Sequence, residues 1–212
     1  MNFFKPLRKL YIKSTDFTHS YQGKDKKLVS FYKAWSYCYD FSVNLDPAFG
    51  REMKTMIGLT VKPGDTTLDI GCGTGISTFY ASRIVAKVIG IDLSADMVRK
   101  LEQKISRRKS VNIEVITGRF PEALPHNIRF NSIISSFAIV HFTPEQRKNI
   151  YKQIYNLLLS GGRLGLFSAQ GEIASSFETK NEIVNNLESA GFNKIEVDSV
   201  SDIYRIIKAE KQ

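Results

Sequence analysis

The stretch LDIGCGTG (residues 68–75) is the most informative part of this chain. A short apolar run ends at Ile70, and three glycines follow at alternate positions, namely Gly71, Gly73 and Gly75. Glycine adopts backbone angles that other residues avoid and leaves the main chain open to close contact. The pattern predicts a strand, a loop that a ligand touches through its main chain, and a helix whose free N–H groups add a positive end.

Two common nucleotide-binding motifs do not match this loop. A dinucleotide-binding loop has the pattern G-x-G-x-x-G. Counted from Gly71, the last glycine position falls on Ile76, and counted from Gly73 it falls on Thr78. A P-loop needs lysine and then Ser or Thr after its glycines, and no such pair follows here. The order is instead D-x-G-x-G-x-G, with Asp69 inside the end of the strand.

An acid, Asp92, ends the second predicted strand in the segment VIGIDLS (residues 88–94). It follows Gly71 by about 20 residues, the spacing at which an acid accepts hydrogen bonds from ribose hydroxyls. Asp92 could instead cap the next helix, but Ser94 is the better cap there. Together the loop and Asp92 predict a site for an adenosine-type ligand, without demanding a pyrophosphate.

Strand and helix signals alternate after the turn KPGD (residues 62–65). Repeated strand–helix units require a largely parallel sheet covered by helices. The last two strands lie too close together for a helical crossover and should pair as a hairpin. We therefore predict an α/β fold, a doubly wound, mostly parallel seven-stranded sheet with an antiparallel C-terminal hairpin. Strands are predicted at residues 67–70, 87–91, 113–116, 130–136, 163–168, 194–200 and 204–209, and helices at 49–59, 76–85, 94–109, 144–159 (ended by Gly161 and Gly162) and 178–190.

The composition suits a single intracellular domain. The chain has 212 residues and 42% hydrophobic content, enough to bury a core without staples. Its two cysteines, Cys38 and Cys72, make neither a disulfide framework nor a metal-ligand cluster, so we expect a reduced, cytoplasmic setting and no metal. No apolar run is long enough to span a bilayer, and no secretory signal is visible. The net charge of +9 favours an anionic partner such as RNA, anionic lipid or a charged cofactor, although a basic surface that only aids solubility fits as well.

The first 45 residues are expected to form a helical extension or lid, and residues 46–212 the main domain. Residues 1–15 contain no acid and show a basic amphipathic pattern. They could lie on an anionic membrane, pack on the domain or form a free tail. An aromatic face at helical spacing follows, which either docks a helix on the core or lines an apolar substrate pocket. It consists of Leu28, Phe31, Tyr32, Trp35 and Tyr39.

LDIGCGTG followed by IGIDLSADMV (residues 89–98) resembles the class I S-adenosylmethionine-dependent methyltransferases. The resemblance covers most of the chain. LLLSGGRLGLFS (residues 157–168) is similar to the family's segment before and through its fifth strand, and NLESAGFNKIEV (residues 186–197) to its last helix and sixth strand. It implies S-adenosylmethionine as the cofactor.

By that resemblance, the carboxylate of Asp69 orients the methionine end of the cofactor through the loop or a water, and Asp92 holds the ribose hydroxyls. Leu93 and Met97 flank the adenine. One departure concerns the segment TGRFPEALP (residues 117–125), where the family often has an acid for the adenine amino group. Here Arg119 and Phe120 stand instead, and Phe120 could stack or offer its backbone. The remaining expected cofactor residues are Gly71, Cys72, Gly73, Gly75 and Ser135.

Within the superfamily, the chain looks nearest to the ubiquinone/menaquinone and phospholipid N-methyltransferases. The segments that carry this are YKAWSYCYDFSVNLDPAFGREM (residues 32–53) and SSFAIVHF (residues 135–142). The implied reaction is methyl transfer to a small-molecule or lipid-like acceptor. The protein is expected to be a cytoplasmic monomer or homodimer, with membrane association as an alternative. The alternative is an RNA or protein methyltransferase that uses the basic surface, although SSFAIV replaces the Asn-Pro-Pro-Tyr-like signature of many such enzymes.

A phenol or an activated ring carbon would benefit from a general base, whereas an amine acceptor needs only to be unprotonated. His141 is the candidate base because it follows the fourth strand and should face the pocket. It could equally be a packing or loop histidine. Tyr32 and Tyr39, from the expected lid, are the further catalytic candidates.

Overall fold

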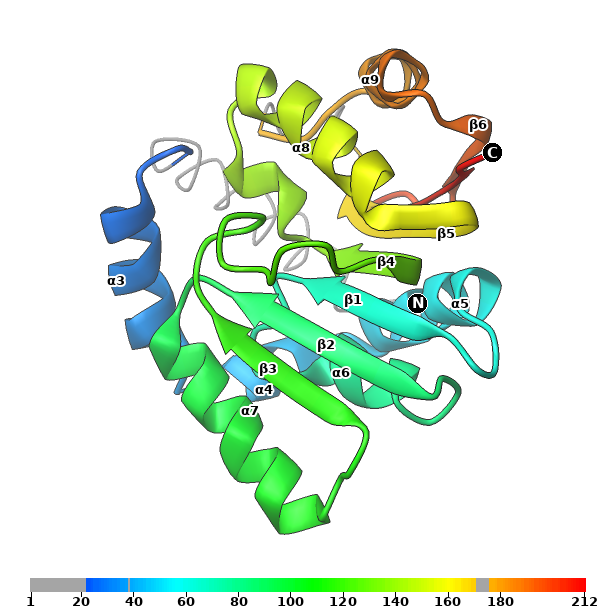
Figure 1. Ribbon diagram of the computed structural model, residues 1–212. Coiled ribbons are helices and arrows are strands. Elements are labelled where there is room, and N and C mark those ends of the chain that lie inside the picture. Colours follow the sequence, from blue (N-terminus) through cyan, green and yellow to red (C-terminus); the bar gives the residue numbers. More distant parts are fainter. Residues whose placement is uncertain (1–21, 38, 171–175) are drawn as a thin grey trace.

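Seven strands form one sheet at the centre of the molecule (Figure 1). The computed structural model describes residues 22–37, 39–170 and 176–212. The strands are β1 (Thr66–Ile70), β2 (Lys87–Asp92), β3 (Ile113–Thr117), β4 (Phe130–Ser136), β5 (Leu158–Ala169), β6 (Asn193–Ser199) and β7 (Tyr204–Glu210). Their order is β3-β2-β1-β4-β5-β7-β6, and β7 runs antiparallel to both β5 and β6 while the other pairs are parallel. The predicted fold class and its C-terminal hairpin are confirmed.

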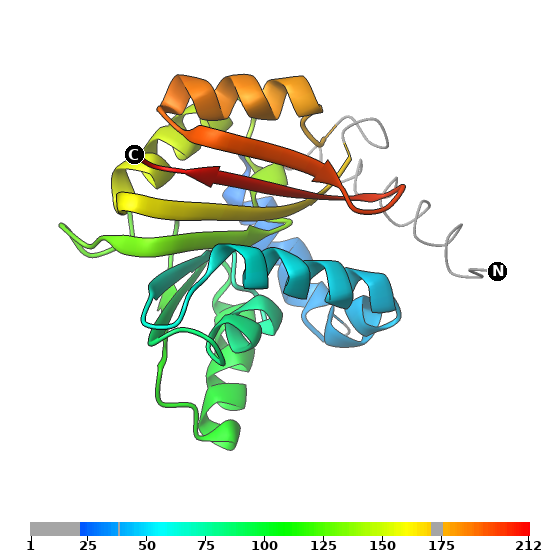
Figure 2. The same ribbon diagram turned by 90° about the vertical axis from the view of Figure 1, so that its right-hand side faces the viewer.

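Helices cover both faces of the sheet, as Figures 1 and 2 show. One layer holds α5, α6 and α7, and the other holds α8 and α9, while α3 and α4 lie near the edge where β1 and β2 end. The helices are α3 (Asp25–Trp35), α4 (Tyr39–Asn44), α5 (Pro47–Thr60), α6 (Ile76–Ala81), α7 (Ala95–Arg108), the 3-10 helix η1 (Ile139–His141), α8 (Pro144–Leu157) and α9 (Lys180–Ala190).

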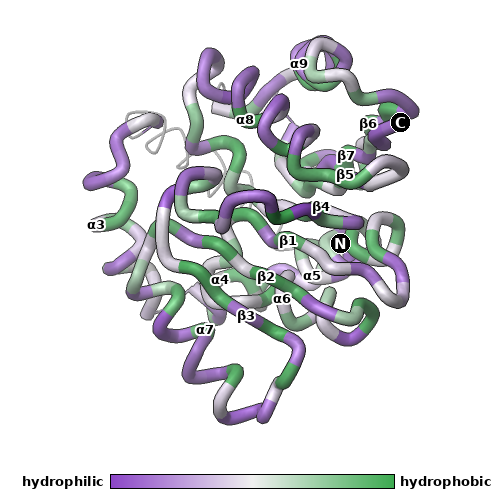
Figure 3. Tube along the Cα trace, viewed as in Figure 1, coloured by the Kyte–Doolittle hydropathy of each residue, from purple (hydrophilic) through white to green (hydrophobic). Residues whose placement is uncertain are grey.

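The core lies between the sheet and these two helical layers. Leu68 and Ile70 of β1 pack on the side of α8 and α9, whereas Val88 and Ile134 pack with α5 on the other side. Both faces of the central strands therefore carry buried apolar side chains, which are interspersed with polar ones in β1 and β4 (Figure 3), and a sheet of this kind needs two covering layers.

The chain reverses its direction of strand addition between β1 and β4, which are neighbours in the sheet. Crossovers leave this point toward opposite faces, so a crevice opens beyond the carboxyl ends of these strands. Helix α3 lies beside that edge in Figure 1. The fold thus places the glycine loop, which follows β1, at the mouth of the crevice.

Two predicted helices extend two or more residues beyond the observed C-terminal ends. Helix α6 ends at Ala81 instead of residue 85, because the side-chain amide of Asn112 bonds the carbonyl oxygens of Ser82 and Val85, at 2.8 and 3.2 Å, and holds a turn there. Helix α8 ends at Leu157, so Gly161 and Gly162 do not end it. Both glycines lie inside β5, which starts at Leu158 because that residue pairs with Phe130 of β4.

Residues 1–15, for which membrane contact was one of three alternatives, lie outside the described residues. Within the described part of the chain, no helix combines the length and the apolar character needed to cross a bilayer.

Candidate active site

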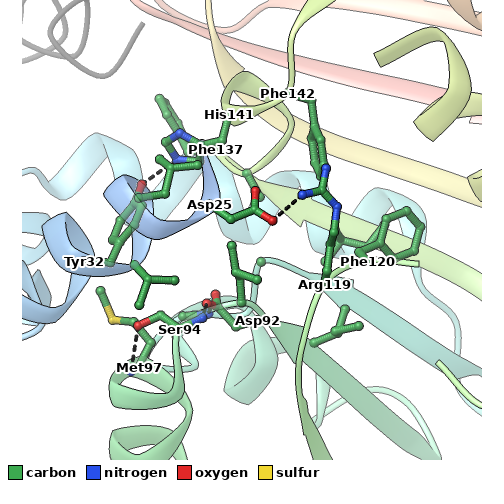
Figure 4. A pocket seen from close by; sticks show the side chains of 18 of the residues that line it. Asp25, Tyr32, Asp92, Ser94, Met97, Arg119, Phe120, Phe137, His141 and Phe142 are labelled. Atoms are coloured by element: carbon green, nitrogen blue, oxygen red, sulfur yellow. Dashed lines mark hydrogen bonds and ion pairs between the residues drawn. The ribbon is translucent and has the colours of Figure 1, made fainter. Parts of the chain in front are cut away.

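A cavity opens at the carboxyl ends of β1, β2 and β4, beneath α3 (Figure 4). It encloses about 930 Å³ of empty space, its open mouth included, which lies within the range of small-molecule sites. The wall is mainly apolar, with a few polar groups at separate points. Its apolar and aromatic residues include Leu28, Val29, Leu93, Met97, Phe120, Phe137 and Phe142.

The three glycines of the loop serve different purposes. All have positive φ angles, 71° for Gly71, 53° for Gly73 and 93° for Gly75. A Cβ on Gly71 would lie 2.2 Å from the Cβ of Ala138, and one on Gly75 would lie 2.3 Å from Cδ1 of Leu101. A Cβ on Gly73 would meet no atom within 4 Å, although Gly73 lines the cavity. Gly71 and Gly75 are thus required by packing, while Gly73 leaves a cradle on the main chain that a ligand can fill.

Asp92 holds the glycine loop from the end of β2. Its Oδ2 accepts a hydrogen bond from the Gly73 N–H at 2.8 Å, and its Oδ1 accepts one from the Ser94 N–H at 2.8 Å. Burial raises the pKa of this carboxyl above its ordinary value, and the two backbone donors oppose the rise. A carboxylate has about four acceptor positions, so Asp92 can still accept hydrogen bonds from the two hydroxyls of a ribose. Ser94 caps α7, as the sequence predicted.

Asp69 is fully buried below the loop and does not line the cavity. Its Oδ2 accepts hydrogen bonds from the hydroxyls of Ser77 and Thr78, both at 2.7 Å. Its Oδ1 is buried and has no hydrogen-bond partner among the described residues. Burial raises the pKa of Asp69 to about 6. The orphaned oxygen fits the expected water-mediated role, while Oδ2 anchors the start of α6.

Leu93, Met97 and Phe120 line the same cavity, as expected for residues around an adenine ring. Arg119 lines it as well, and its guanidinium forms an ion pair with Asp25 of α3 (Figure 4). Asp25 was not foreseen from the sequence, since it stands far from Arg119 along the chain. The departure from the family pattern at Arg119 thus coincides with a contact to α3.

His141 and Tyr32 meet at the other end of the cavity in Figure 4. The Tyr32 hydroxyl lies 2.5 Å from Nε2 of His141, and the two rings pack edge to face at 5.3 Å. Burial, with a smaller effect from the Arg147 guanidinium, lowers the pKa of His141 to about 4. The imidazole is therefore neutral at pH 7 and able to accept a proton. Its Nδ1 is buried without a partner among the described residues.

Tyr39 also lines the cavity but belongs to another helix than Tyr32. The predicted aromatic face treated residues 28–39 as one continuous helix, and this is wrong. Helix α3 ends at Trp35, a turn follows, and Tyr39 opens α4. Burial and the nearby carboxylate of Asp92 raise the pKa of Tyr39 well above its ordinary value, so its hydroxyl stays protonated.

Two expected cofactor residues turn their side chains away from the cavity. Cys72 packs its sulfur against the backbone of Gly90, where a Cβ would come within 2.9 Å of Sγ, and burial raises the pKa of its thiol. Ser135 is buried and donates its hydroxyl proton to the carbonyl oxygen of Ile70 at 2.8 Å. Neither residue lines the cavity. The neighbouring Ser136 does, because adjacent strand residues face opposite sides.

Besides Asp25, three lining residues in or after the β4–α8 connection carried no recognisable signal in the sequence. Phe137 adopts φ 58°, a conformation that is rare for an aromatic residue. Ala138 sits on Gly71, and Gln146 reaches the cavity from α8. The contacts of all three depend on how the β4–α8 connection folds over the loop.

Known proteins with similar sequences or structures are methyltransferases or carry their fold. Residues 67–162 match the family model described as a methyltransferase domain. The arsenite methyltransferase of Halobacterium salinarum is 26% identical over 155 residues, which cover 64% of this chain and 39% of that protein. Phosphoethanolamine N-methyltransferase 3 of Arabidopsis thaliana is 36% identical over 108 residues, covering 50% of this chain and 21% of that protein. The chain thus spans less than half the length of these two relatives.

Among solved structures, the complex of DhpI with SAH superposes with a TM-score of 0.72 at 17% identity. The match covers 87% of this chain and 95% of that one, so most of the fold is shared. The matched family model spans β1 to the start of β5, the part that contributes the glycine loop and Asp92 to the cavity. Residues 67–162 are therefore similar to a methyltransferase domain, and the chain shares the fold of the DhpI–SAH complex.

Proposed function

We propose that the protein transfers a methyl group from S-adenosylmethionine to a small, uncharged and mainly apolar acceptor. The observation that carries this proposal is one cavity with two chemically different ends. Gly73 and Asp92 stand at one end, and the neutral pair of His141 and Tyr32 stands at the other (Figure 4).

The loop end fits the cofactor. Gly73 offers an open main chain, Asp92 offers acceptor positions for the ribose, and Leu93 and Met97 offer an apolar surface for the adenine. The orphaned Oδ1 of Asp69 suits a bridging water beneath the methionine end. Bound S-adenosylmethionine supplies a methyl group already activated by its sulfonium, so the protein needs mainly to align the acceptor and exclude water.

The other end handles the proton that the acceptor loses. Alkylation makes the acceptor oxygen or nitrogen positively charged and its proton acidic, so a weak base is sufficient. In this proposal the Tyr32 oxygen takes that proton while its own proton passes to Nε2 of His141, 2.5 Å away. Tyr32 is thereby restored, and His141 ends the step protonated and later releases the proton to solvent. Tyr39, with a protonated hydroxyl in the same cavity, can donate a hydrogen bond that orients the acceptor.

The charges in the cavity favour an uncharged acceptor over a phosphorylated one. Arg119 is the one cationic side chain among the described residues that line it, and its guanidinium is paired with Asp25. A phosphate buried here would lack a spare cation, and an unpaired buried charge is costly. The proposed acceptor therefore differs from phosphoethanolamine, the compound in the name of the Arabidopsis relative. Hydroquinones and similar phenols fit the apolar wall and the proton-accepting pair.

Helices α3 and α4 would act as a lid over this cavity, with residues 46–212 forming the catalytic domain. Three contacts support this role, because they tie the two helices to separate parts of the rim. Asp25 pairs with Arg119, the Ser36 carbonyl accepts a hydrogen bond from Lys100 at 2.6 Å, and Asp40 accepts one from Thr74 at 2.5 Å. Opening the lid would admit the acceptor, and closing it would exclude water.

The test has two stages. Calorimetric titration should show micromolar binding of S-adenosylhomocysteine and none of NAD. The protein is then incubated with S-adenosylmethionine and, separately, with a hydroquinone, phosphoethanolamine and a short RNA, while release of S-adenosylhomocysteine is followed. We expect turnover with the hydroquinone alone. Absence of S-adenosylhomocysteine binding would overturn the cofactor assignment, and turnover with phosphoethanolamine or RNA would overturn the acceptor class.

A further inference from the structure

Three exposed apolar side chains lie on α4 and just beyond its two ends. Among the described residues seven large apolar side chains are exposed, and three of them fall within nine residues. These are Tyr37 at 82%, Phe41 at 69% and Leu45 at 48% exposure. Phe41 lies on α4, and the Leu45 N–H donates to the Phe41 carbonyl oxygen at 3.1 Å, so these two side chains share one side of the helical turn. Tyr37 lies in the turn before α4. We call these three residues the α4 face.

Three other side chains of α4 contact the rest of the protein. Tyr39 lines the cavity and Val43 packs against the core around α5. Asp40 is tied to Thr74 and to Lys104 of α7, each at 2.5 Å. The helix is therefore fixed in its rotation, and the α4 face cannot turn inward without breaking these contacts.

Basic side chains lie beside Tyr37 and in two grooves that residues of α4 help to line. The ammonium of Lys100 lies 4.3 Å above the ring of Tyr37. Two grooves beside α4, which share Ile76 and Tyr80, are lined by five basic and two acidic residues. The basic residues are Arg51, Lys54, Arg83, Lys104 and Arg108, and the acidic ones are Asp40 and Asp46.

An apolar row bordered by cations fits the surface of an anionic bilayer, where aromatic rings enter the interface and basic residues meet lipid phosphates. A single-stranded nucleic acid would instead need open ring faces inside the basic groove. There Phe79 is buried beneath Arg108 at 4.2 Å, and Lys54 covers the ring of Tyr80 at 4.5 Å. Leu45 has no aromatic ring on which a base could stack.

We infer that the α4 face, with its flanking basic residues, is a docking surface for an anionic phospholipid membrane. Because α4 also contributes Tyr39 to the cavity wall, a docked membrane would lie against the same helix that borders the site. The docking itself does not depend on the proposed reaction, so it is tested by binding alone.

The experiment measures co-sedimentation of the full chain with phosphatidylcholine vesicles, with and without phosphatidylserine. Phe41→Ser should weaken binding to the anionic vesicles about tenfold, since a large apolar side chain no longer enters the interface. Val111→Ser is the matched control, because Val111 is 98% exposed in the loop before β3 and lies outside the face. Circular dichroism and S-adenosylhomocysteine binding should be unchanged in both variants.

The charge contribution has its own pair of variants. Lys54→Gln combined with Arg83→Gln should weaken binding by about fivefold per residue, whereas Lys152→Gln with Lys180→Gln, on α8 and α9, should have little effect. Equal effects of the two double variants would indicate attraction by net charge alone and would overturn the proposal.

Two further outcomes would also overturn it. If Phe41→Ser binds anionic vesicles as well as the unmodified chain, the contact lies elsewhere, for example in residues 1–21. The second outcome is that the chain does not bind vesicles but binds fluorescein-labelled oligouridylate. If the Lys54 and Arg83 double variant also loses that binding, the basic grooves bind a nucleic acid instead.

Discussion

The Tyr32 hydroxyl lies 2.5 Å from Nε2 of His141, although the two residues stand on different elements, α3 and η1, far apart in the sequence. This contact joins the lid to the end of β4. It also brings two catalytic candidates from the sequence into hydrogen-bond contact.

The pair should behave as a unit in kinetics. With a hydroquinone as acceptor, Tyr32→Phe and His141→Gln should each lower kcat about 10²-fold, the lower range for general base catalysis. The double variant should be little worse than either single one, because both changes break the same relay. Tyr155→Phe, on α8 and packed against Phe192, is the control. Full additivity of the two losses would argue against the relay.

His141 should stay neutral to unusually low pH. Its pKa is lowered to about 4, so the unfolded chain binds more protons than the folded chain between pH 6.5 and about 4. The contribution of His141 to stability is therefore present above pH 6.5 and lost as the pH falls toward 4. The chain has three histidines, so its imidazole NMR spectrum is simple and His141→Gln assigns the signal. That signal should keep the shift of a neutral ring down to about pH 5, and titration near pH 6.5 would contradict the structure.

Asp92→Asn should weaken the binding of S-adenosylhomocysteine by about 10- to 100-fold, the range for losing a hydrogen bond to a charged group. The amide retains one acceptor oxygen, so it cannot hold the Gly73 and Ser94 amides and the ribose together. Asp96→Asn, which breaks a surface ion pair with Arg99, is the matched control and should bind normally. Calorimetry gives both affinities, and equal values would remove Asp92 from the cofactor site.

The glycine loop allows a comparison within one motif. Replacement by Ala forces a positive φ on a residue with a Cβ, which costs about 1 kcal/mol at each position. Gly71→Ala and Gly75→Ala should lose about 1–3 kcal/mol more, because their Cβ atoms collide with Ala138 and Leu101. Gly73→Ala should melt closest to the unmodified chain and yet bind S-adenosylhomocysteine poorly. Thermal melts and calorimetry test this, and a Gly73 variant with normal affinity would show that no ligand occupies the cradle.

Local patterns predicted the sheet, the glycine loop and Asp92, because each depends on residues close together in the sequence. The central strands carry apolar side chains on both faces, and the loop needs glycine for its positive φ angles. The predicted C-terminal end of α6 was wrong because Asn112, which holds the turn there, lies about 30 residues downstream. Ser135 was expected at the site in place of Ser136, since a position error of one residue exchanges the two faces of a strand.

The contacts of the lid could not be foreseen for the same reason. Nothing near Asp25 in the sequence indicates Arg119, and the break between α3 and α4 falls within an unbroken helical pattern of aromatic residues. Such pairings depend on where the β3 and β4 loops lie after folding. Residues that line a site but lie outside the sequence motifs can therefore be identified only from the structure.

The final prediction concerns that lid. Asp25 and Arg119 are both about one-third exposed, so their ion pair is worth at most about 1 kcal/mol. Asp25→Asn should leave the melting temperature nearly unchanged. It should speed amide hydrogen exchange in α3 up to about fivefold, because the ion pair ties this helix, and not the rest of the fold, to the rim of the cavity. Asp96→Asn removes an ion pair within α7 and serves as control, with no change expected in α3. If α3 exchanges equally fast in both variants and the unmodified chain, Asp25 does not hold the lid, and Tyr32 would be the contact to examine in its place.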